Sequence, residues 1–214
     1  VRVTLSSHMR ALTVLNKTII DCAACPRLVI YRQEIARQKR KQYRDWTYWG
    51  RPVPGFGDRQ ARLYVLGLAP AAHGGNRTGR VFTGDRSGDW LYDALYWYGF
   101  ANQALSTHQE DGLSLTDCYI GATVRCAPPE NKPAPDEFQR CSRFLQDEVR
   151  LLKNHRVVIA LGKIAFDPYL KTCRAQGHAM PAPVQKFGHG VVYRLPWGVI
   201  LLGSYHPSQQ NTFT

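Results

Sequence analysis

The chain has 214 residues and a formal net charge of +12, with 44% hydrophobic and 21% charged residues. This composition is ordinary for a globular protein and excludes a disordered or fibrous chain. A chain this basic, with a sequence pI of about 9.7, is typical of proteins that bind a polyanion, and nucleic acid is the first candidate. Since we find neither a membrane-spanning apolar run nor a signal peptide, we expect a cytoplasmic protein without membrane partners.

The N-terminal part is predicted to be an appendage, about residues 13–58, to one domain that spans residues 1–214. Residues 13–44 have helical character and end in a basic run, which by itself is typical of a solvated helix face. This basic run consists of Arg37, Lys39, Arg40, Lys41 and Arg44. Residues 45–58 are rich in aromatic residues, Gly and Pro, and are predicted to form a loop packed by its own side chains. The main core is expected from about residue 61 to residue 214.

Strands and helices alternate in this core. Helices are predicted at residues 89–98, 135–152 and 163–171 from their apolar periodicity. Strands are predicted at residues 62–68, 118–124, 156–161 and 199–204, with a short edge strand at 193–196. The four main strands are unbroken apolar runs, the pattern of strands buried on both faces. The sequence therefore predicts an α/β fold with a mostly parallel sheet covered on both sides.

Four of the six cysteines form two pairs. Cys22 and Cys25 make a C-x-x-C pair, and Cys126 and Cys141 are separated by fourteen residues. Four thiolates in a 2+2 pattern suit a tetrahedral zinc ion or a [4Fe–4S] cluster, and the spacing does not choose between them. The alternative is that these are unligated cysteines or a redox C-x-x-C, which the second pair makes less favourable.

Polar motifs follow three of the predicted strands. The first strand runs into a glycine-rich segment that ends at Asp85, the second into a loop with Asn131, and the last into His206-Pro-Ser-Gln-Gln-Asn211. Because open α/β sheets bind ligands at the carboxyl ends of their strands, we expect these loops to converge at one rim. That rim would carry a carboxylate, amides, an imidazole and several glycines.

Each of these residues also has a purely structural interpretation. Asp85 would cap the following helix, Asn131 would be a turn residue, and His206 would be a loop histidine. Two further functions are open at this point. A non-catalytic Fe–S or zinc nucleic-acid-binding module explains the charge and the cysteines, and a phosphate-ester hydrolase would use Asp85 but normally needs several metal-binding carboxylates. The convergence of the three loops favours a catalytic site.

Taken together, Gly67-Leu-Ala-Pro-Ala, Thr83-Gly-Asp85-Arg-Ser-Gly, the cysteine pairs and the segment from His206 to Asn211 resemble the uracil-DNA glycosylase superfamily, and within it family 5, or type b. Apolar residues stand where the family 4 relatives carry a Glu, which favours family 5. The resemblance implies a three-layer α/β/α sandwich around a four-stranded parallel sheet. It also implies a monofunctional enzyme of base excision repair, a monomer that acts on DNA in the prokaryotic nucleoid.

The resemblance further implies a [4Fe–4S] cluster of structural rather than redox role. Its expected ligands are Cys22, Cys25, Cys126 and Cys141.

Glycosidic bond hydrolysis needs a donor for the leaving base and a carboxylate for the cationic sugar. We expect His206 to be the donor and Asp85 to be the carboxylate, in the place that the resemblance also indicates. Asn131 is the third residue of the predicted catalytic set and is expected to read the edge of the flipped base, and Phe82 is expected to stack on that base. Besides Phe82, Asn131 and His206, the predicted base-binding residues are Gly67 and Ala69.

The remaining predictions concern DNA and the range of bases. Since an apolar wall rejects related bases poorly, we expect deaminated purines such as hypoxanthine to be released as well. The basic run is expected to contact phosphates, and the segment after Pro207 to fill the gap left by the flipped base. The expected DNA-binding residues are Gly74, Gly75, Asn76, Arg77, Arg80, Lys132, Ser208, Gln209, Gln210 and Asn211.

Overall fold

The computed structural model describes the backbone of residues 2–207 and the side chains of residues 10–207. It contains one mixed sheet with the strand order β1-β3-β2-β4-β6-β5. The strands are β1 (Phe56–Gly57), β2 (Leu63–Gly67), β3 (Cys118–Ala122), β4 (Val157–Leu161), β5 (Val192–Arg194) and β6 (Ile200–Ser204). The four inner strands are parallel, whereas β1 and β5 pair antiparallel at the two edges.

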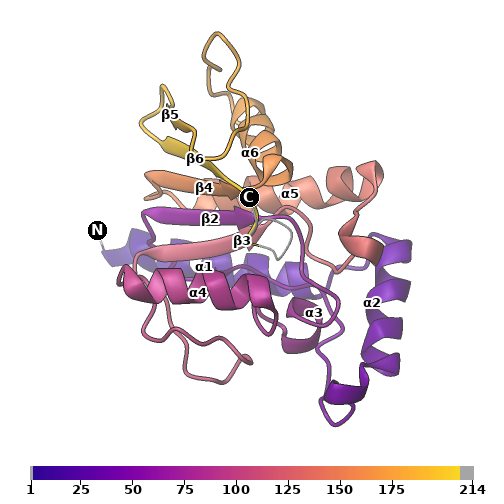
Figure 1. The fold of residues 1–214 in the computed structure, drawn as a ribbon. Helices are drawn as coiled ribbons and strands as arrows, with labels where there is room; N and C mark the ends of the chain where they lie inside the picture. The colour runs from indigo at the N-terminus through magenta and orange to yellow at the C-terminus, as the bar shows by residue number, and fades with distance from the viewer. Residues whose placement is uncertain (1, 208–214) are drawn as a thin grey trace.

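Helices cover both faces of this sheet, so that the predicted three-layer α/β/α arrangement is confirmed (Figure 1). The helices are α1 (Arg2–Ile20), α2 (Pro26–Gln38), α3 (Gly75–Thr78), α4 (Arg86–Trp97), α5 (Pro135–Leu151) and α6 (Lys163–Ala175), with short 3-10 turns η1 (Lys41–Tyr43) and η2 (Pro129–Asn131). Helix α1 packs on α5, α5 packs on α6, and α6 packs on β2 and β4. Helix α4 lies on the opposite face.

Strand β2 shows how its apolar run serves both layers. All five of its residues are buried. Tyr64 and Leu66 belong to the core cluster formed with α1, α5 and α6. Leu63 and Val65 belong to the cluster on the other face, which includes Tyr92 and Leu95 of α4. A strand buried on both sides needs apolar residues at every position, which explains the unbroken pattern in the sequence.

The sheet has six strands rather than the four that the resemblance implied. Strand β5 confirms the short edge strand predicted at residues 193–196, whereas the antiparallel strand β1 at the other edge was not predicted. The helical character predicted for residues 13–44 is present, but it belongs to two helices. Pro26 begins a second helix, and residues 21–25, which include Cys22 and Cys25, form the break between α1 and α2. Only Arg37 of the basic run lies within α2, and the rest forms a turn after it.

Among the described residues, no helix is both long and apolar enough to cross a membrane.

Candidate active site and cysteine pocket

The carboxyl ends of the parallel strands lie at one edge of the sheet, where the glycine-rich segment after β2 begins. This segment is tied to the loop after β3 by backbone hydrogen bonds, since Thr123 N donates to Gly67 O at 3.0 Å and Val124 N to Leu68 O at 2.8 Å. Ala69 packs at the margin of the main core. The first predicted loop therefore starts where the sheet topology requires.

Phe82 and His206 meet at this edge, although 124 positions separate them in the chain. Their rings are stacked, with centroids 5.7 Å apart and an interplanar angle of 29°. Phe82 has a φ of +51°, an uncommon value for a non-glycine residue that turns its side chain back over β2. A Cβ atom at Gly67 would lie 2.6 Å from the Phe82 ring, so glycine is needed for this approach. Gly67, Phe82 and His206, three of the residues predicted to bind the base, therefore lie together at this edge.

Asp85 lies beside this surface and performs the structural task that we considered for it. It is the N-cap of α4, and its Oδ1 accepts a hydrogen bond from Gly88 N at 3.1 Å. Its second oxygen, Oδ2, faces Gly74, where any Cβ atom would clash with it. Gly74 thus makes room for a carboxylate of the protein. Capping uses Oδ1 and leaves Oδ2 available to interact with a substrate. Asp85 can therefore be both a helix cap and a catalytic carboxylate.

The electrostatics of His206 favour its neutral form. Burial lowers its pKa, and the Asp85 carboxylate works in the opposite direction without cancelling the effect. The two side chains are therefore close enough to interact. A neutral imidazole can donate one hydrogen bond without bringing a full positive charge into the site.

Asn131 and Lys132 are placed differently. Both are exposed and belong to the turn around η2, where Glu130 and Asn131 have φ values of +52° and +56°. Lys132 forms an exposed ion pair with Glu130 at 3.6 Å. Among the described residues, no hydrogen bond or ring contact joins Asn131 to Asp85, Phe82 or His206. Ser208, Gln209, Gln210 and Asn211 lie outside the described residues.

Asn76, Arg77 and Arg80 are buried, with exposed fractions of 0%, 4% and 3%. Asn76 donates to the carbonyl of Arg32 in α2 at 3.1 Å. Their placement does not support the expectation that they contact DNA phosphates, because protein groups already surround them. Gly75 is also buried, packed against Pro70 at the start of α3.

Arg80 is the centre of a buried polar network. Its Nη2 lies 2.5 Å from Asp111 Oδ2 and 2.9 Å from Ser106 Oγ, and its Nε donates to Thr83 Oγ1 at 3.0 Å. Burial by itself would raise the pKa of Asp111, but hydrogen bonds from Arg80 and from backbone N–H groups outweigh it and hold that pKa well below its usual range. The network joins the glycine-rich segment to the loop between α4 and β3.

Loss of Asp111 should therefore destabilise the fold. Asp111→Ala leaves the Arg80 guanidinium buried without its anion, and we expect the free energy of unfolding in urea to fall by about 3–5 kcal/mol. Asp93→Ala, an exposed position on α4, is the control and should change it by less than about 0.5 kcal/mol. Equal losses in both variants would contradict the prediction.

The same pair predicts a pH dependence. A carboxyl group with a lowered folded-state pKa contributes stability above its unfolded value, near 3.9, and loses this contribution as the pH falls toward the folded value. The stability difference between the wild type and Asp111→Asn should thus be largest near neutral pH and shrink below about pH 4.

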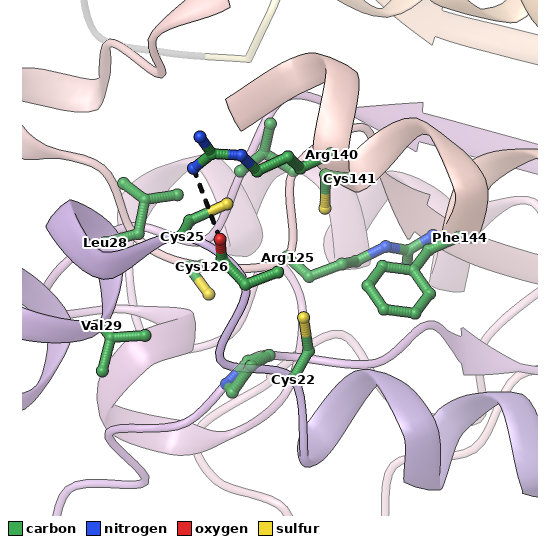
Figure 2. Close-up of a pocket in the computed structure, with 12 residues that line it drawn as sticks. Cys22, Cys25, Leu28, Val29, Arg125, Cys126, Arg140, Cys141 and Phe144 are labelled. Atoms are coloured by element: carbon green, nitrogen blue, oxygen red, sulfur yellow. Dashed lines mark hydrogen bonds between the residues drawn. The ribbon is translucent and has the colours of Figure 1, made fainter. Parts of the chain in front are cut away.

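The four paired cysteines line one pocket, to which three separate segments contribute. Cys22 and Cys25 come from the break between α1 and α2, Cys126 follows β3, and Cys141 lies in α5. Figure 2 shows their sulfur atoms directed toward a common space. Cys118 and Cys173 are buried elsewhere in the core. The structure thus brings the four paired cysteines to one pocket and leaves the other two outside it.

The surroundings of this pocket combine apolar and cationic groups. Leu28, Val29 and Phe144 line it, and Arg143 Nη2 lies 3.7 Å from Cys22 Sγ. Burial raises the pKa of Cys126 to about 12 and that of Cys141 to about 11. Among residues 10–207, no three His, Cys, Asp or Glu side chains gather closely enough to hold a single metal ion.

An ion pair joins the first turns of α2 and α5. Arg27 donates through Nε and Nη2 to the two carboxylate oxygens of Glu137, at 2.8 and 2.7 Å. Glu137 is 3% exposed and also accepts from Ala134 N at 2.7 Å. This pair holds α2 against α5 beside Cys25 and Cys141.

Sequence reasoning missed the partners of the buried arginines. The rings of Tyr43 and Trp46 cover Arg77, and Asp111 neutralises Arg80. Tyr48 was also missed, and its hydroxyl lies 3.0 Å from His73 Nδ1 beside Gly74. The signal in the sequence was the aromatic content of residues 45–58, which predicted a packed loop but neither included Tyr43 nor showed what the loop packs against.

Comparison with known proteins gives consistent results. The family model of the uracil DNA glycosylase superfamily matches residues 54–214. A type-5 uracil-DNA glycosylase from Mycobacterium tuberculosis (strain CDC 1551 / Oshkosh) is 54% identical over 201 residues, which cover 94% of this chain and 74% of that protein. Type-5 enzymes from Mycobacterium leprae and Thermus thermophilus are 50% and 48% identical, over 98% and 92% of this chain and 90% and 87% of their own lengths.

Proposed function

Since the chain belongs to the uracil-DNA glycosylase superfamily and is a DNA glycosylase that excises uracil from DNA, we propose that Asp85 and His206 are its catalytic residues. The observation that carries this proposal is the meeting of Phe82, His206 and Asp85 at the carboxyl ends of β2 and β6. The chemistry requires these groups. An aromatic ring holds a flipped base, a neutral donor faces its carbonyl, and a carboxylate faces the sugar.

The proposed mechanism divides the developing charge between two groups. As the N-glycosidic bond breaks, negative charge grows on the base and positive charge on the sugar. His206 donates a hydrogen bond to the base carbonyl O2, and Asp85 stabilises the sugar cation and orients the attacking water. Phe82 stacks on the base within the wall that Gly67 and Ala69 complete.

Asn131 has the amide chemistry to pair with the base edge. Because Asn131 is exposed, its contact with the base requires the loop around η2 to move inward when DNA binds.

The test is incubation with uracil-containing DNA, followed by alkali and a denaturing gel. A monofunctional glycosylase releases the free base and leaves the backbone intact until alkali is added. Scission without alkali would favour the hydrolase alternative, and tight binding without turnover would favour the non-catalytic binding module. A parallel substrate with hypoxanthine tests the wider base range, and no release of hypoxanthine at high enzyme concentration would restrict the enzyme to uracil.

We propose that Cys22, Cys25, Cys126 and Cys141 hold a [4Fe–4S] cluster. Four thiols from three segments surround one pocket, and this donor set fits such a group. The cluster would supply a structural link between the α1–α2 break, the loop after β3 and α5. It takes no part in the glycosidic step. The choice of iron over zinc rests on the family resemblance.

Cysteine substitution tests the cluster. Cys126→Ala is expected to lower the iron content and the broad absorption near about 400 nm that Fe–S thiolates give, and to damage folding. Cys173→Ala is the matched control, because Cys173 is buried away from the pocket, and it should keep both signals. A colourless, fully active protein with stoichiometric zinc would refute the cluster.

We propose that the basic turn after α2 contacts DNA phosphates, with the chain acting as a monomer on nucleoid DNA in the cytoplasm. Arg40, Lys41 and Arg44 are exposed there, and the chain as a whole carries a charge of +12.

Binding should therefore depend strongly on salt, since phosphate neutralisation releases counterions. Replacing Arg40 and Lys41 together by Gln should reduce the slope of log K against log salt concentration by up to about 2. The control is the same replacement by Gln at Arg150 and Lys153, two exposed residues at and just after the C-terminal end of α5. An unchanged slope in the variant of Arg40 and Lys41 would mean that the basic run is solvated and does not contact DNA phosphates.

A further inference from the structure

The guanidinium of Arg77 connects two backbone segments that lie on either side of Asp85. Its Nε donates to the carbonyl of His73 at 2.8 Å, and its Nη2 donates to the carbonyl of Gly84 at 3.0 Å. Gly84 directly precedes Asp85, and His73 directly precedes Gly74, the residue that faces Asp85 Oδ2. One planar group thus fixes the spacing of both walls of the gap that holds this carboxylate.

Two aromatic rings cover the same guanidinium. The Cζ atom of Arg77 lies 3.9 Å from the ring centroid of Tyr43 and 4.1 Å from that of Trp46. Tyr43 ends η1, and Trp46 follows it in the basic turn, which the hydrogen bond from Lys39 Nζ to the Arg44 carbonyl at 3.1 Å helps to close. The turn that carries the exposed cations is therefore packed directly on Arg77.

We infer that Arg77 is a positioning residue, which holds the Asp85 carboxylate in its working geometry and links that geometry to the placement of the basic turn at residues 39–46. The inference rests on the proposed function of Asp85. DNA phosphates held by the turn would press its two rings onto the guanidinium, and this contact would keep Gly84 and His73 at their spacing. Contact with the backbone of the substrate then favours the assembled site.

The chemistry of arginine suits this role better than that of lysine. A guanidinium offers donors in a fixed plane, so it can reach two carbonyls while the rings of Tyr43 and Trp46, which are inclined at 74° to each other, contact it. A lysine would keep the charge, but its three N–H donors share one nitrogen atom and have no fixed plane. Since Arg77 is only 4% exposed, a direct phosphate contact would require the turn to leave it.

The test is Arg77→Lys, measured in three ways on the intact, cluster-containing protein. We expect the single-turnover rate of uracil release at saturating enzyme to fall about 10–100-fold, as for a small misplacement of a catalytic group. The dissociation constant for uracil-containing DNA should change by less than about 3-fold, well below the tenfold that one lost charged contact of 1.4 kcal/mol would give. Backbone hydrogen exchange at residues 82–88 should become faster.

Two further variants separate positioning from general stability. Trp46→Ala should reproduce the loss of rate, and Trp46→Phe, which keeps an aromatic face, should restore most of it. Arg51→Lys is the matched control, because Arg51 is an exposed arginine that also lies near an aromatic ring, 5.7 Å from that of Trp49. It should leave the rate and the exchange at residues 82–88 unchanged.

Three results would overturn the inference. An unchanged rate at saturating enzyme with weaker binding and a salt slope reduced by about 1 would make Arg77 a phosphate contact. If the loss of rate in Arg77→Lys equals the fraction of unfolded protein at each of several temperatures, then the role of Arg77 is only structural. Unchanged exchange at residues 82–88 would break the link to Asp85. Failure of the wild type to release uracil would instead refute the proposed function, and the exchange measurement would still decide the role of Arg77.

Discussion

Replacing His206 with Ala is expected to lower the single-turnover rate of uracil release by about 10²–10³, the loss that follows removal of one preorganised donor to a developing anion. DNA binding should change little, because the donor is needed most when the base carries charge. The measurement is rapid-quench release of uracil at saturating enzyme. Full activity of His206→Ala would mean that backbone N–H groups stabilise the leaving base instead.

The pH profile of the wild type gives a second check on His206. Burial lowers the pKa of this imidazole, so the neutral donor is the main form at neutral pH. The single-turnover rate should therefore rise with pH through a value below 6.5, the usual pKa of histidine, and level off above it. In His206→Gln, which cannot titrate, this limb should disappear. A wild-type rate that increases as the pH falls below 6 would mean that the protonated imidazole is the active form.

Asp85→Asn is the second substitution with a large expected effect. Asparagine is as good an N-cap as aspartate, so the hydrogen bond from Gly88 N and the stability of α4 should be retained. The negative charge opposite the sugar is lost, and we expect the single-turnover rate to fall by about 10²–10⁴. DNA binding should stay near normal or become slightly tighter, because one anion near the phosphates is removed.

Asp85→Ala separates the two roles of this residue. It removes the cap as well as the charge, so it should also lower the free energy of unfolding by about 1 kcal/mol. If Asp85→Asn keeps full activity while Asp85→Ala only loses stability, then Asp85 is a helix cap and no more. If both Asp85→Asn and His206→Ala stay active, the convergence of the loops has identified the wrong residues.

The parts of the fold that the sequence predicted are those with a local signal. The four parallel strands were found within one or two residues because strands buried on both faces need apolar residues throughout. Helix α4 begins three residues before the predicted start because the capping group is Asp85 itself. The two-residue strand β1 carries no periodic pattern, and hydrogen bonds to β3 alone define it.

The site was predictable to a similar extent. Phe82 and Asp85 lie in the segment that begins at the end of β2, and His206 follows β6, so the sheet topology predicts that these segments start at one edge. The roles of Arg77 and Arg80 were not predictable, because their partners lie about thirty positions away or more and no pattern in the sequence marks the pairing. A basic residue in a glycine-rich segment indicates a phosphate contact only while it is exposed. Arg77 and Arg80 are buried, and this burial depends on tertiary structure, which the sequence pattern does not show.

The order of the strands has a consequence for the synthesis of the chain. Asp85 follows β2, but His206 follows β6, and β4 lies between these two strands in the sheet. A ribosome that adds about 5–20 residues each second needs several seconds to a few tens of seconds to produce the segment between them. During that time the growing polypeptide holds the acidic group without its imidazole partner. Catalytic activity should therefore appear only after β6 and His206 have left the exit tunnel. Release of uracil would then show that the sheet has been completed.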